Sequence, residues 1–430
     1  MTMGFQTLDE WLAWQEGLHA RRVDLGLERV GWVAEAMGLD HPSYRVVTVA
    51  GTNGKGSCVA LLHSTLSAAG YRVGAYTSPH LLRYNERVRV GGAVASDAQL
   101  CRAFARIDDA RRDVALTYFE YGTLAALDVF REAQVDIALL EVGMGGRLDA
   151  TNVVDADVAV VAALAVDHVD WLGPDRETIA REKAGIFRPR RPAVCGDPDP
   201  PRSLLAHAAG LSTPLYRVGV DFDYRSAPES WEWHCGSRRR GALPFPALTG
   251  EFQLRNAAAV LMALELLADH FPVSQDDVRR GLQEVQLAGR FQVIPGPVER
   301  ILDVAHNPQA AEALAANLAR RPCGGRTLAV VALLGDKDIE GVVVALDLMV
   351  HRWLVADLPG PRAVPVAELA SRIRRAGVRG GVSTHPGVED ALERAQVEAQ
   401  PGDRIVIFGS FRTVEEALRV DERAARARDG

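Results

Sequence analysis

Short apolar runs rich in β-branched residues alternate with amphipathic segments along the first half of this chain. The predicted strands are Val46–Ala50, Val73–Tyr76, Asp136–Glu141 and Val158–Ala163, and the predicted helices are Leu116–Arg131 and Arg176–Ala184. Strands that alternate with helices in this way predict parallel strands joined by crossover helices. The pattern therefore favours an α/β fold in which helices cover both faces of a sheet.

The second half repeats this pattern after two changes of composition. Residues 195–250 are rich in Pro, Trp and charge and predict a small antiparallel β decoration, whereas Asn256–Ala268 predicts a helix. Glycine and proline near 288–297 indicate a linker. The next strands are predicted near Arg300–Val304, Thr327–Leu333, Trp353–Ala356 and Arg404–Phe408. We expect an N-terminal domain over 1–287 and a C-terminal Rossmann-like α/β domain over 298–430.

Composition excludes several classes of protein. The net charge of −7 and the pI near 5.9 give no electrostatic footprint for nucleic acid. The five cysteines are scattered without a C-x-x-C pair, which argues against a disulfide framework or a zinc site and favours a reducing cytoplasm. No signal peptide is evident at the N-terminus, and the longest apolar run, Val158 to Val166, is too short to span a bilayer.

The strand at Val46–Ala50 leads into a glycine-rich turn with one lysine and one hydroxyl. The turn comprises Gly51, Thr52, Asn53, Gly54, Lys55, Gly56 and Ser57, and a helical segment follows. In a phosphate-binding loop, backbone N–H groups and a helix N-terminus hold the anion, the lysine meets its charge and the hydroxyl reaches Mg²⁺. The spacing departs from G-x-x-x-x-G-K-[ST] and points to ATP-dependent amide ligases. The alternative is a strand-to-helix turn without a ligand.

Two further strand ends carry groups that bind metals. Glu141 ends an apolar strand, and such a carboxylate holds Mg²⁺ on nucleotide phosphates in many enzymes. His168, between Asp167 and Asp170, follows the next apolar strand and is a candidate metal ligand. Because sites in parallel sheets lie at the carboxyl ends of strands, we expect these groups and the phosphate loop to share one site.

Other polar residues have two interpretations each. Lys183 closes a helix, and from the residues alone we interpret it as a C-terminal cation favoured by the helix dipole. Thr77–Leu81 predicts a mobile polar loop or an ordinary turn. Asp303 and His306 lie at a strand end before Asn307, which is expected to cap a helix and can contribute to chemistry as well.

Together these motifs resemble the folylpolyglutamate synthase/dihydrofolate synthase family within the Mur ligase superfamily. The resemblance runs from about Trp11 to about Leu418. The matching segments are Gly51–Ser57, Thr77–Leu81, Glu141–Asn152, Asp167–Gly173, Arg181–Phe187, Gly289–Phe291, Asp303–Pro308 and Gly409–Val414. One departure is Arg412, where the family often has His or Leu. The fold that the resemblance implies is an N-terminal P-loop ATPase-type parallel-sheet domain followed by a C-terminal Rossmann-like domain.

The resemblance implies a ligase reaction. ATP would phosphorylate a carboxylate of dihydropteroate or a reduced folate, and the α-amine of L-glutamate would attack the acyl phosphate to give an amide, ADP and phosphate. Such catalysis needs charge neutralisation and alignment more than a protein nucleophile. The implied catalytic residues are Lys55, Lys183, His168 and His306.

The resemblance also implies binding residues and cofactors. For ATP these are the phosphate loop from Gly51 to Ser57 with Asn256, Arg290 and Asp303. For one or two Mg²⁺ ions they are Ser57, Glu141, His168 and Lys183, the last as a carbamate. For the pterin substrate they are Ser78, Pro79, His80, Arg83, Thr117, Phe119, Asp149 and Ala150. Phe119 and Asp149 can equally be core and cap residues.

Three alternatives stay open. A peptidoglycan Mur ligase would carry a further domain before the phosphate loop, and only about fifty residues precede Gly51 here. A nucleotide-binding module without ligase activity is disfavoured by the joint presence of Lys55, Glu141 and Lys183. An enzyme that only extends folate polyglutamates is the third, but Arg147–Asn152 resembles the bifunctional type. We expect a monomer.

Overall fold

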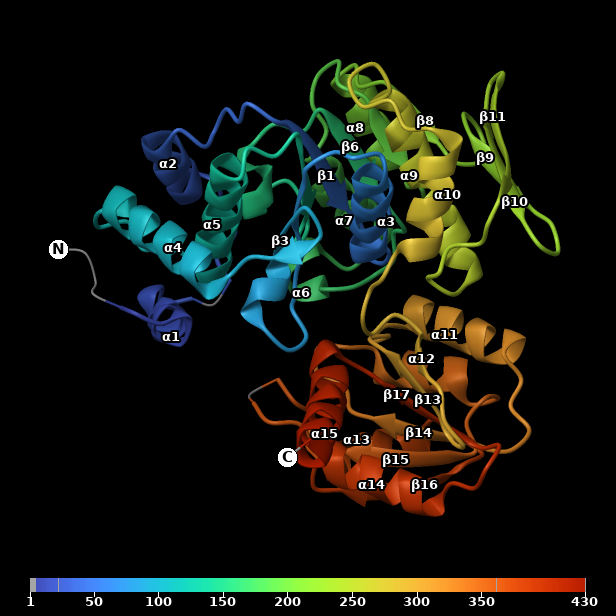
Figure 1. Ribbon diagram of the computed structural model, residues 1–430. Helices are drawn as coiled ribbons and strands as arrows, with labels where there is room; N and C mark the ends of the chain where they lie inside the picture. Colours follow the sequence, from blue (N-terminus) through green and yellow to red (C-terminus); the bar gives the residue numbers. More distant parts are fainter. Residues whose placement is uncertain (1–4, 22, 361, 430) are drawn as a thin grey trace. The chain divides into compact units, whose positions relative to one another are not determined.

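The computed structural model describes residues 5–21, 23–360 and 362–429, with side chains to residue 423. Within it the chain forms two compact units (Figure 1). The first consists of the residues up to Ala247 together with Gln253–Val285. The second consists of Leu248–Phe252 and the residues from Gln286 onward.

The first unit is built on an eight-stranded sheet in the order β4-β3-β2-β5-β1-β6-β7-β8. The strands are β1 Arg45–Ala50, β2 Val73–Tyr76, β3 Val88–Val90, β4 Ala93–Val94, β5 Ile137–Glu141, β6 Val158–Val161, β7 Ala193–Cys195 and β8 Leu215–Arg217. Strands β2, β5, β1, β6, β7 and β8 are parallel to one another, whereas β3 and β4 add an antiparallel edge. The register places Glu141 beside Val49 and Val161 beside Ala50, so β1, β5 and β6 end together.

Helices cover this sheet. They are α1 Leu8–Leu18, α2 Glu28–Met37, α3 Lys55–Ala68, α4 Asp97–Arg111, α5 Tyr118–Glu132, α6 Val169–Leu172, α7 Arg176–Ala184, α8 Arg202–Gly210, α9 Glu251–Leu266 and α10 Gln275–Glu284, with short 3₁₀ turns η1 Tyr84–Arg87 and η2 Ala150–Val153. Helix α3 packs against α10 on one side and against β2 and β5 on the other. The phosphate loop therefore leads into a helix that is fixed on both sides.

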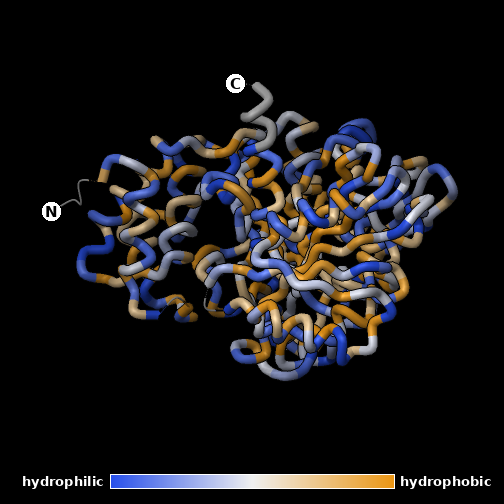
Figure 2. The backbone as a smooth tube through the Cα atoms, turned by 90° about the horizontal axis from the view of Figure 1, so that it is seen from below, coloured by the Kyte–Doolittle hydropathy of each residue, from blue (hydrophilic) through white to orange (hydrophobic). Residues whose placement is uncertain are grey.

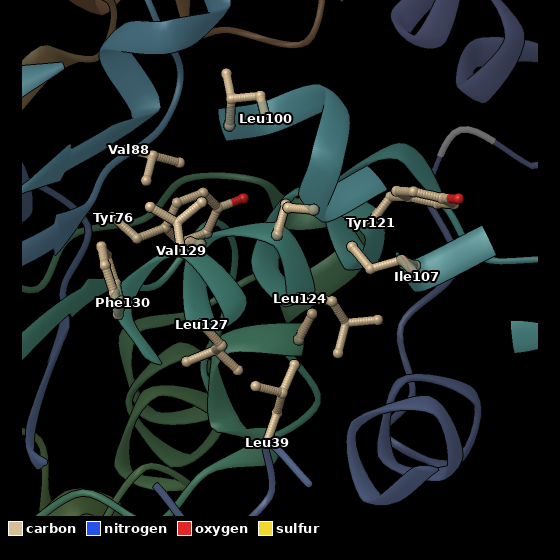
Figure 3. Close-up of a cluster of buried hydrophobic side chains, with 14 of the residues drawn as sticks. Leu39, Tyr76, Val88, Leu100, Ile107, Tyr121, Leu124, Leu127, Val129 and Phe130 are labelled. Atoms are coloured by element: carbon tan, nitrogen blue, oxygen red, sulfur yellow. The ribbon is translucent and has the colours of Figure 1, made fainter. Parts of the chain in front are cut away.

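A hydrophobic core of the first unit surrounds helix α5 (Figure 3). Tyr121, Leu124, Leu127 and Phe130 of α5 are all fully buried, because α1, α2, α4 and β2 pack around this helix. Full burial of each such side chain stabilises the fold by about 1.5–3 kcal/mol. The core thereby fixes the start of α5, which carries Thr117 and Phe119 toward the candidate site.

A three-stranded antiparallel sheet decorates the first unit, as expected from the composition. It consists of β9 Asp223–Ser226, β10 Trp231–Cys235 and β11 Arg238–Leu243, in the order β11-β10-β9. Trp231 and Trp233 point to its buried face, and the indole Nε1 of Trp233 donates to the Ala258 carbonyl at 3.1 Å. This contact attaches the small sheet to helix α9.

The second unit has a six-stranded sheet in the order β12-β13-β17-β14-β15-β16. The strands are β12 Gln292–Ile294, β13 Glu299–Asp303, β14 Thr327–Val331, β15 Arg352–Ala356, β16 Gly381–His385 and β17 Arg404–Phe408, and the helices are α11 Pro308–Arg320, α12 Ile339–Leu346, α13 Val366–Arg375, α14 Val388–Glu398 and α15 Phe411–Asp429. All strands are parallel except β12, which lies within the segment 288–297 and pairs antiparallel with β13.

The α/β fold class is confirmed. Hydrophobic and hydrophilic stretches are interspersed along the backbone (Figure 2). One detail of the expectation was wrong, because the first sheet is not wholly parallel. Its antiparallel edge arises where the chain turns back after β2 through residues 77–87 to form β3. Strand β4 then pairs with β3 across a tight turn at Gly91 and Gly92, both of which have positive φ. Among the described residues, no helix combines the length and apolar character that a membrane crossing requires.

Candidate active site

The phosphate loop lies between β1 and α3, and two of its glycines are required by the backbone. Gly51 has φ 153° and Gly54 has φ 87°, which side-chain-bearing residues rarely adopt. A Cβ on Gly54 would lie 2.7 Å from the Asn256 side-chain oxygen. Because α3 begins at Lys55, the N–H groups of Gly56 and Ser57 belong to its first turn, where no helical carbonyl accepts them. The loop is thus a ready anion site.

The segment after β6 is hydrogen-bonded to this loop. The Thr52 backbone N–H donates to the Ala163 carbonyl at 2.7 Å, and its hydroxyl donates to the Ala165 carbonyl at 2.9 Å. The Ala165 N–H in turn lies 3.1 Å from the same hydroxyl. The strand end that carries Asp167 and His168 is therefore attached to the phosphate loop, as the sequence predicts.

Two lysines converge on one carbonyl of the phosphate loop. The ammonium of Lys55 donates to the carbonyls of Gly51 at 2.9 Å and Thr52 at 3.2 Å. The Lys183 nitrogen donates to the same Gly51 carbonyl at 2.9 Å. Burial, and secondly the charge of Lys55, lower the pKa of Lys183 to about 7. The interpretation of Lys183 as a plain C-terminal cation was wrong, because tertiary packing buries it (4% exposed) in this site.

Lys183 reaches the phosphate loop because α7 ends in very close contact with the segment after β5. A Cβ on Gly146 would lie 3.0 Å from the carbonyls of Glu182 and Lys183. A Cβ on Gly185 would lie 2.3 Å from the Arg147 Cβ. The Arg147 N–H also donates to the Glu182 carbonyl at 2.8 Å. Gly146 and Gly185 thus allow the close backbone packing that positions Lys183.

Gly185→Ala is expected to displace the end of α7 and Lys183 with it. We expect the free energy of unfolding to fall by about 1–3 kcal/mol, since the added methyl overlaps Arg147. Turnover is expected to fall roughly tenfold to a hundredfold as Lys183 moves. Urea unfolding and steady-state kinetics measure the two effects. Gly210→Ala, at a helical glycine with no atom within 4 Å of the added Cβ, is the control and should be neutral or slightly stabilising.

The depressed pKa of Lys183 predicts a pH-dependent stability difference. Below pH 7 the folded protein holds a buried cation, whereas above pH 7 the folded amine is neutral while the unfolded one stays protonated up to about 10.5. The unfolded state then binds more protons, so the stability contribution of Lys183 rises with pH across this window. A Lys183→Met variant should be more stable than wild type at pH 6 by on the order of a few kcal/mol.

The advantage of this variant should shrink between pH 7 and 10.5 as the folded amine of the wild type becomes neutral. Denaturant titrations at several pH values, in CO₂-free buffer with EDTA, measure it. A difference that stays constant from pH 6 to 10 would contradict the proposed burial of a titrating amine.

Oxygen and nitrogen donors suited to a divalent cation lie at these strand ends. Glu141 is buried, and its Oε2 accepts the Ser78 N–H at 3.2 Å. The Ser57 hydroxyl is buried at the start of α3, and Asp167 accepts the His168 N–H at 2.8 Å. Within the described ranges no three His, Cys, Asp or Glu residues form a metal cluster. A carboxylate and a hydroxyl fit Mg²⁺, whereas the Lys183 amine fits only after conversion to an oxygen ligand.

The segment around Ser78, Pro79, His80 and Arg83 is held in place by one carboxylate. Glu86 accepts the N–H groups of Leu81, Leu82 and Arg83 at 2.7–2.8 Å. His80 Nδ1 accepts the Nε–H of Arg87 at 2.8 Å. Pro79 and Arg83 are exposed. Of the two interpretations of Thr77–Leu81, the ordinary turn agrees better with these contacts, because Glu86 in the next 3₁₀ turn binds the backbone from Leu81 onward.

Of the four residues expected at the pterin, Phe119 and Asp149 lie against the glycine-rich segment after β5, whereas Thr117 precedes α5 and Ala150 begins η2. Phe119 is half-buried, and a Cβ on Gly143 would lie 2.6 Å from its ring. Thr117 caps α5, and Asp149 caps η2 and accepts the Met144 N–H at 2.9 Å. Burial raises the pKa of Asp149 despite these hydrogen bonds. Asp149 thus has the capping role that we considered as its alternative, and the Phe119 ring packs against Tyr76 with 5.8 Å between the ring centroids.

The second unit brings Arg290, Asp303 and His306 together at the end of β13. Asp303 accepts the N–H groups of Phe291 and Ala305, each at 2.8 Å, and burial raises its pKa. The Arg290 guanidinium lies 4.9 Å from the Phe411 ring centroid and opposes the pKa rise of Asp303. Asn307 caps α11 as expected. Asn256, which was expected to bind ATP together with Arg290 and Asp303, lies in the first unit.

Sequence reasoning missed several buried polar residues at these strand ends. Gln253 hydrogen-bonds Ser57. Asp197 accepts the Leu164 N–H at 2.7 Å and the Arg176 guanidinium at 3.2 Å, which fixes the start of the segment with His168. The rarity of lysine in this chain could have drawn attention to Lys337, which is buried after β14. The chain has only three lysines, Lys55, Lys183 and Lys337, against 46 arginines.

Comparisons with known proteins define the class of this site. The family model for the Mur ligase middle domain matches residues 49–264, and the model for the Mur ligase glutamate ligase domain matches residues 289–411. These matches cover the two units in chain order, with the phosphate loop inside the first.

Individual relatives match the whole chain. The dihydrofolate synthase/folylpolyglutamate synthase of Escherichia coli strain K12 is 45% identical, over 96% of this chain and 95% of the relative. A structure of E. coli FolC in complex with DHPP and ADP matches with a TM-score of 0.93 and 44% identity, over 98% of this chain and 99% of that one.

A structure of a bifunctional folylpolyglutamate synthase/dihydrofolate synthase with Mn, AMPPNP and L-glutamate bound matches with a TM-score of 0.90 and 44% identity, over 98% of this chain and 100% of that one. The chain belongs to the dihydrofolate synthase/folylpolyglutamate synthase family of Mur-type ligases. The family expected from the sequence motifs is confirmed.

Proposed function

We propose that this protein is an ATP-dependent ligase that joins L-glutamate to 7,8-dihydropteroate and to reduced folates. The observation that carries the proposal is the convergence of Lys55 and Lys183 on the Gly51 carbonyl. Both lysines therefore lie at the loop that is proposed to bind the phosphates of ATP. The name shared with the bifunctional relatives supports the choice of substrates.

The reaction has two steps in this proposal. A carboxylate oxygen of the pterin substrate attacks the γ-phosphorus of ATP, and ADP leaves. The α-amine of glutamate then attacks the acyl carbon, phosphate leaves with the C–O bonding electrons, and the amine loses a proton. Lys55 neutralises charge on the transferred phosphoryl group, and the first turn of α3 donates N–H groups to the phosphates.

Divalent cations complete the charge neutralisation. Ser57, Glu141 and His168 are the proposed holders of one or two Mg²⁺ ions, and a bound Mg²⁺ would supply positive charge beside the phosphates. The structure of a relative with Mn and AMPPNP supports the use of a divalent metal. Glu141 is also in contact with the Ser78 N–H, which connects the cation site to the substrate segment.

Lys183 is proposed to act as a carbamate. A neutral amine attacks CO₂ and releases a proton, which replaces a cation by an anionic oxygen donor. The pKa of about 7 leaves a large neutral fraction of this amine at physiological pH, whereas an ordinary lysine is almost wholly protonated there. The burial that makes Lys183 costly as a cation is therefore what makes it reactive toward CO₂.

The remaining residues bind the substrates. Asn256, Arg290 and Asp303 are proposed to contact the nucleotide, and His306 the incoming glutamate. The pterin is proposed to stack on Phe119 near Asp149, with Thr117, Ala150 and the turn from Ser78 to Arg83 around it. In this proposal residues 1–287 form the ATP-binding domain and also hold the pterin, and residues 298–430 form the glutamate-ligase domain, which supplies Asp303 to the nucleotide. The linker 288–297 supplies Arg290.

Phosphate release tests the proposal. It is measured with ATP, Mg²⁺ and L-glutamate, plus either 7,8-dihydropteroate or a reduced folate monoglutamate. Release with both acceptors is expected. Release with the folate alone would favour a folylpolyglutamate synthase. Release with neither would contradict the proposal and make peptidoglycan precursors the next acceptors to test.

Two further properties belong to the proposal. The proposed compartment is the cytoplasm, where all five cysteines, each among the described residues, would keep the free thiols that they have in the structure. The proposed state is a monomer, and light scattering across a range of concentrations tests it.

A further inference from the structure

We propose that Gln253 is a positioning residue that sets the direction of the Ser57 hydroxyl in the phosphate loop. The proposal rests on the proposed function in taking Ser57 as a ligand of a divalent cation. Gln253 lies in the first turns of α9, 196 residues from Ser57 in sequence, and is 1% exposed. Its Nε2 donates to the Ser57 Oγ at 3.1 Å.

The Gln253 amide is itself fixed in orientation. Its Oε1 accepts a hydrogen bond from the Asn256 Nδ2 at 3.0 Å. The side-chain oxygen of Asn256 lies against Gly54, at 2.7 Å from where a Cβ would be. Asn256, Gln253 and Ser57 thus form one buried row that touches the phosphate loop at both ends. With its oxygen engaged by Asn256, the amide presents N–H to Ser57.

A donor at this position controls what the hydroxyl can do. A serine hydroxyl has one proton and two acceptor lone pairs. Gln253 occupies one lone pair, which leaves the second for a cation and the proton for a phosphate oxygen. Without Gln253 the hydroxyl can rotate and can donate its proton to other acceptors. Gln253 thereby reduces the orientations of Ser57 to those that suit a cation and a phosphate together.

The test separates metal-dependent from metal-independent nucleotide binding. The affinity for a non-hydrolysable ATP analogue is measured by calorimetry with Mg²⁺ and with EDTA, in wild type, Gln253→Leu and Gln253→Glu. We expect the gain in affinity from Mg²⁺ to fall about five- to tenfold in Gln253→Leu, while binding in EDTA changes less than twofold. Gln253→Glu, which offers an acceptor in place of the donor, should also lose metal-dependent gain.

A double-mutant cycle with Ser57→Ala shows whether Gln253 acts through the hydroxyl. In the Ser57→Ala background, Gln253→Leu should cause no further loss of the Mg²⁺ effect, because the group that it orients is gone. Gln15→Leu is the matched control, since Gln15 is also 1% exposed and its amide has no hydrogen-bond partner among the described residues. It should leave both affinities unchanged.

Three results would overturn the proposal: an unchanged Mg²⁺ effect in Gln253→Leu, an equal loss with and without Mg²⁺, or full additivity with Ser57→Ala. Thermal unfolding of each variant identifies any that fails to fold. If Gln253→Leu fails to fold, the Mg²⁺ effect in Gln253→Glu decides whether the proposal stands. The binding assay needs no turnover. A wild type that binds the Mg²⁺ complex but releases no phosphate would refute the proposed function alone.

Discussion

Lys55→Ala is expected to lower turnover by at least about a hundredfold, which corresponds to roughly 2.7 kcal/mol of barrier. Lys55 is already held at the loop by the carbonyls of Gly51 and Thr52, so its charge is in place before a nucleotide arrives. Charge that is fixed in advance avoids reorganisation during phosphoryl transfer. Steady-state phosphate release at saturating substrates measures the effect.

Lys55→Arg is the control for this variant. It keeps the positive charge but replaces a compact ammonium by a planar guanidinium, and we expect only partial recovery. A loss below about tenfold in Lys55→Ala, roughly 1.4 kcal/mol, would be too small for a group on the transferred phosphate. Removing Lys55 should also raise the pKa of Lys183, because the charge of Lys55 is one cause of its depression.

Lys183→Ala is expected to abolish measurable turnover, with a loss of at least about a hundredfold, while the protein stays folded. The substitution removes the proposed oxygen ligand and the donor to Gly51 but no apolar core. Activity of the wild type should also depend on CO₂, falling in degassed buffer and returning with bicarbonate. Full activity of Lys183→Ala would remove the carbamate from the mechanism.

The scarcity of lysine makes the carbamate directly observable. With ¹³C-bicarbonate, the wild type should show a lysine carbamate resonance by NMR. Since the chain has three lysines, assignment needs few variants. The resonance should vanish in Lys183→Ala and persist in Lys337→Arg, which replaces a buried lysine of the second unit. If the resonance instead vanishes in Lys337→Arg, the carbamate is on Lys337, and the proposal for Lys183 is wrong.

The sequence predicted the central strands better than the edges. Buried parallel strands such as β5 and β17 are continuous apolar runs, so their positions can be identified from the residues alone. Strand β16 lies at a sheet edge, is partly exposed and contains Ser383 and Thr384, so it lacks such a run. Strand β12 has three residues beside a Pro-Gly-Pro turn and exists only through its pairing with β13.

The same distinction applies to the site. The phosphate loop is local, so its glycines, Lys55 and Ser57 are visible in a single stretch of sequence. The position of Lys183 in the site depends on a close contact between two distant segments, which Gly146 and Gly185 allow. Gln253 is a polar residue in an apolar helix, and nothing near it in sequence indicates Ser57 as its partner. Residues whose role depends on contacts across the fold therefore escaped prediction from the residues alone.

Helix α9 has a consequence for how this chain can be divided or recombined. The chain passes between the two compact units at residues 247/248, 252/253 and 285/286. A fragment cut after Val285 would keep Leu248–Phe252 but lose its partners on α11, where Asn317 donates to the Thr249 carbonyl at 3.3 Å and Arg320 pairs with Glu251. A genetic exchange that swaps only the C-terminal half would therefore also have to match these five residues, which lie directly before Gln253.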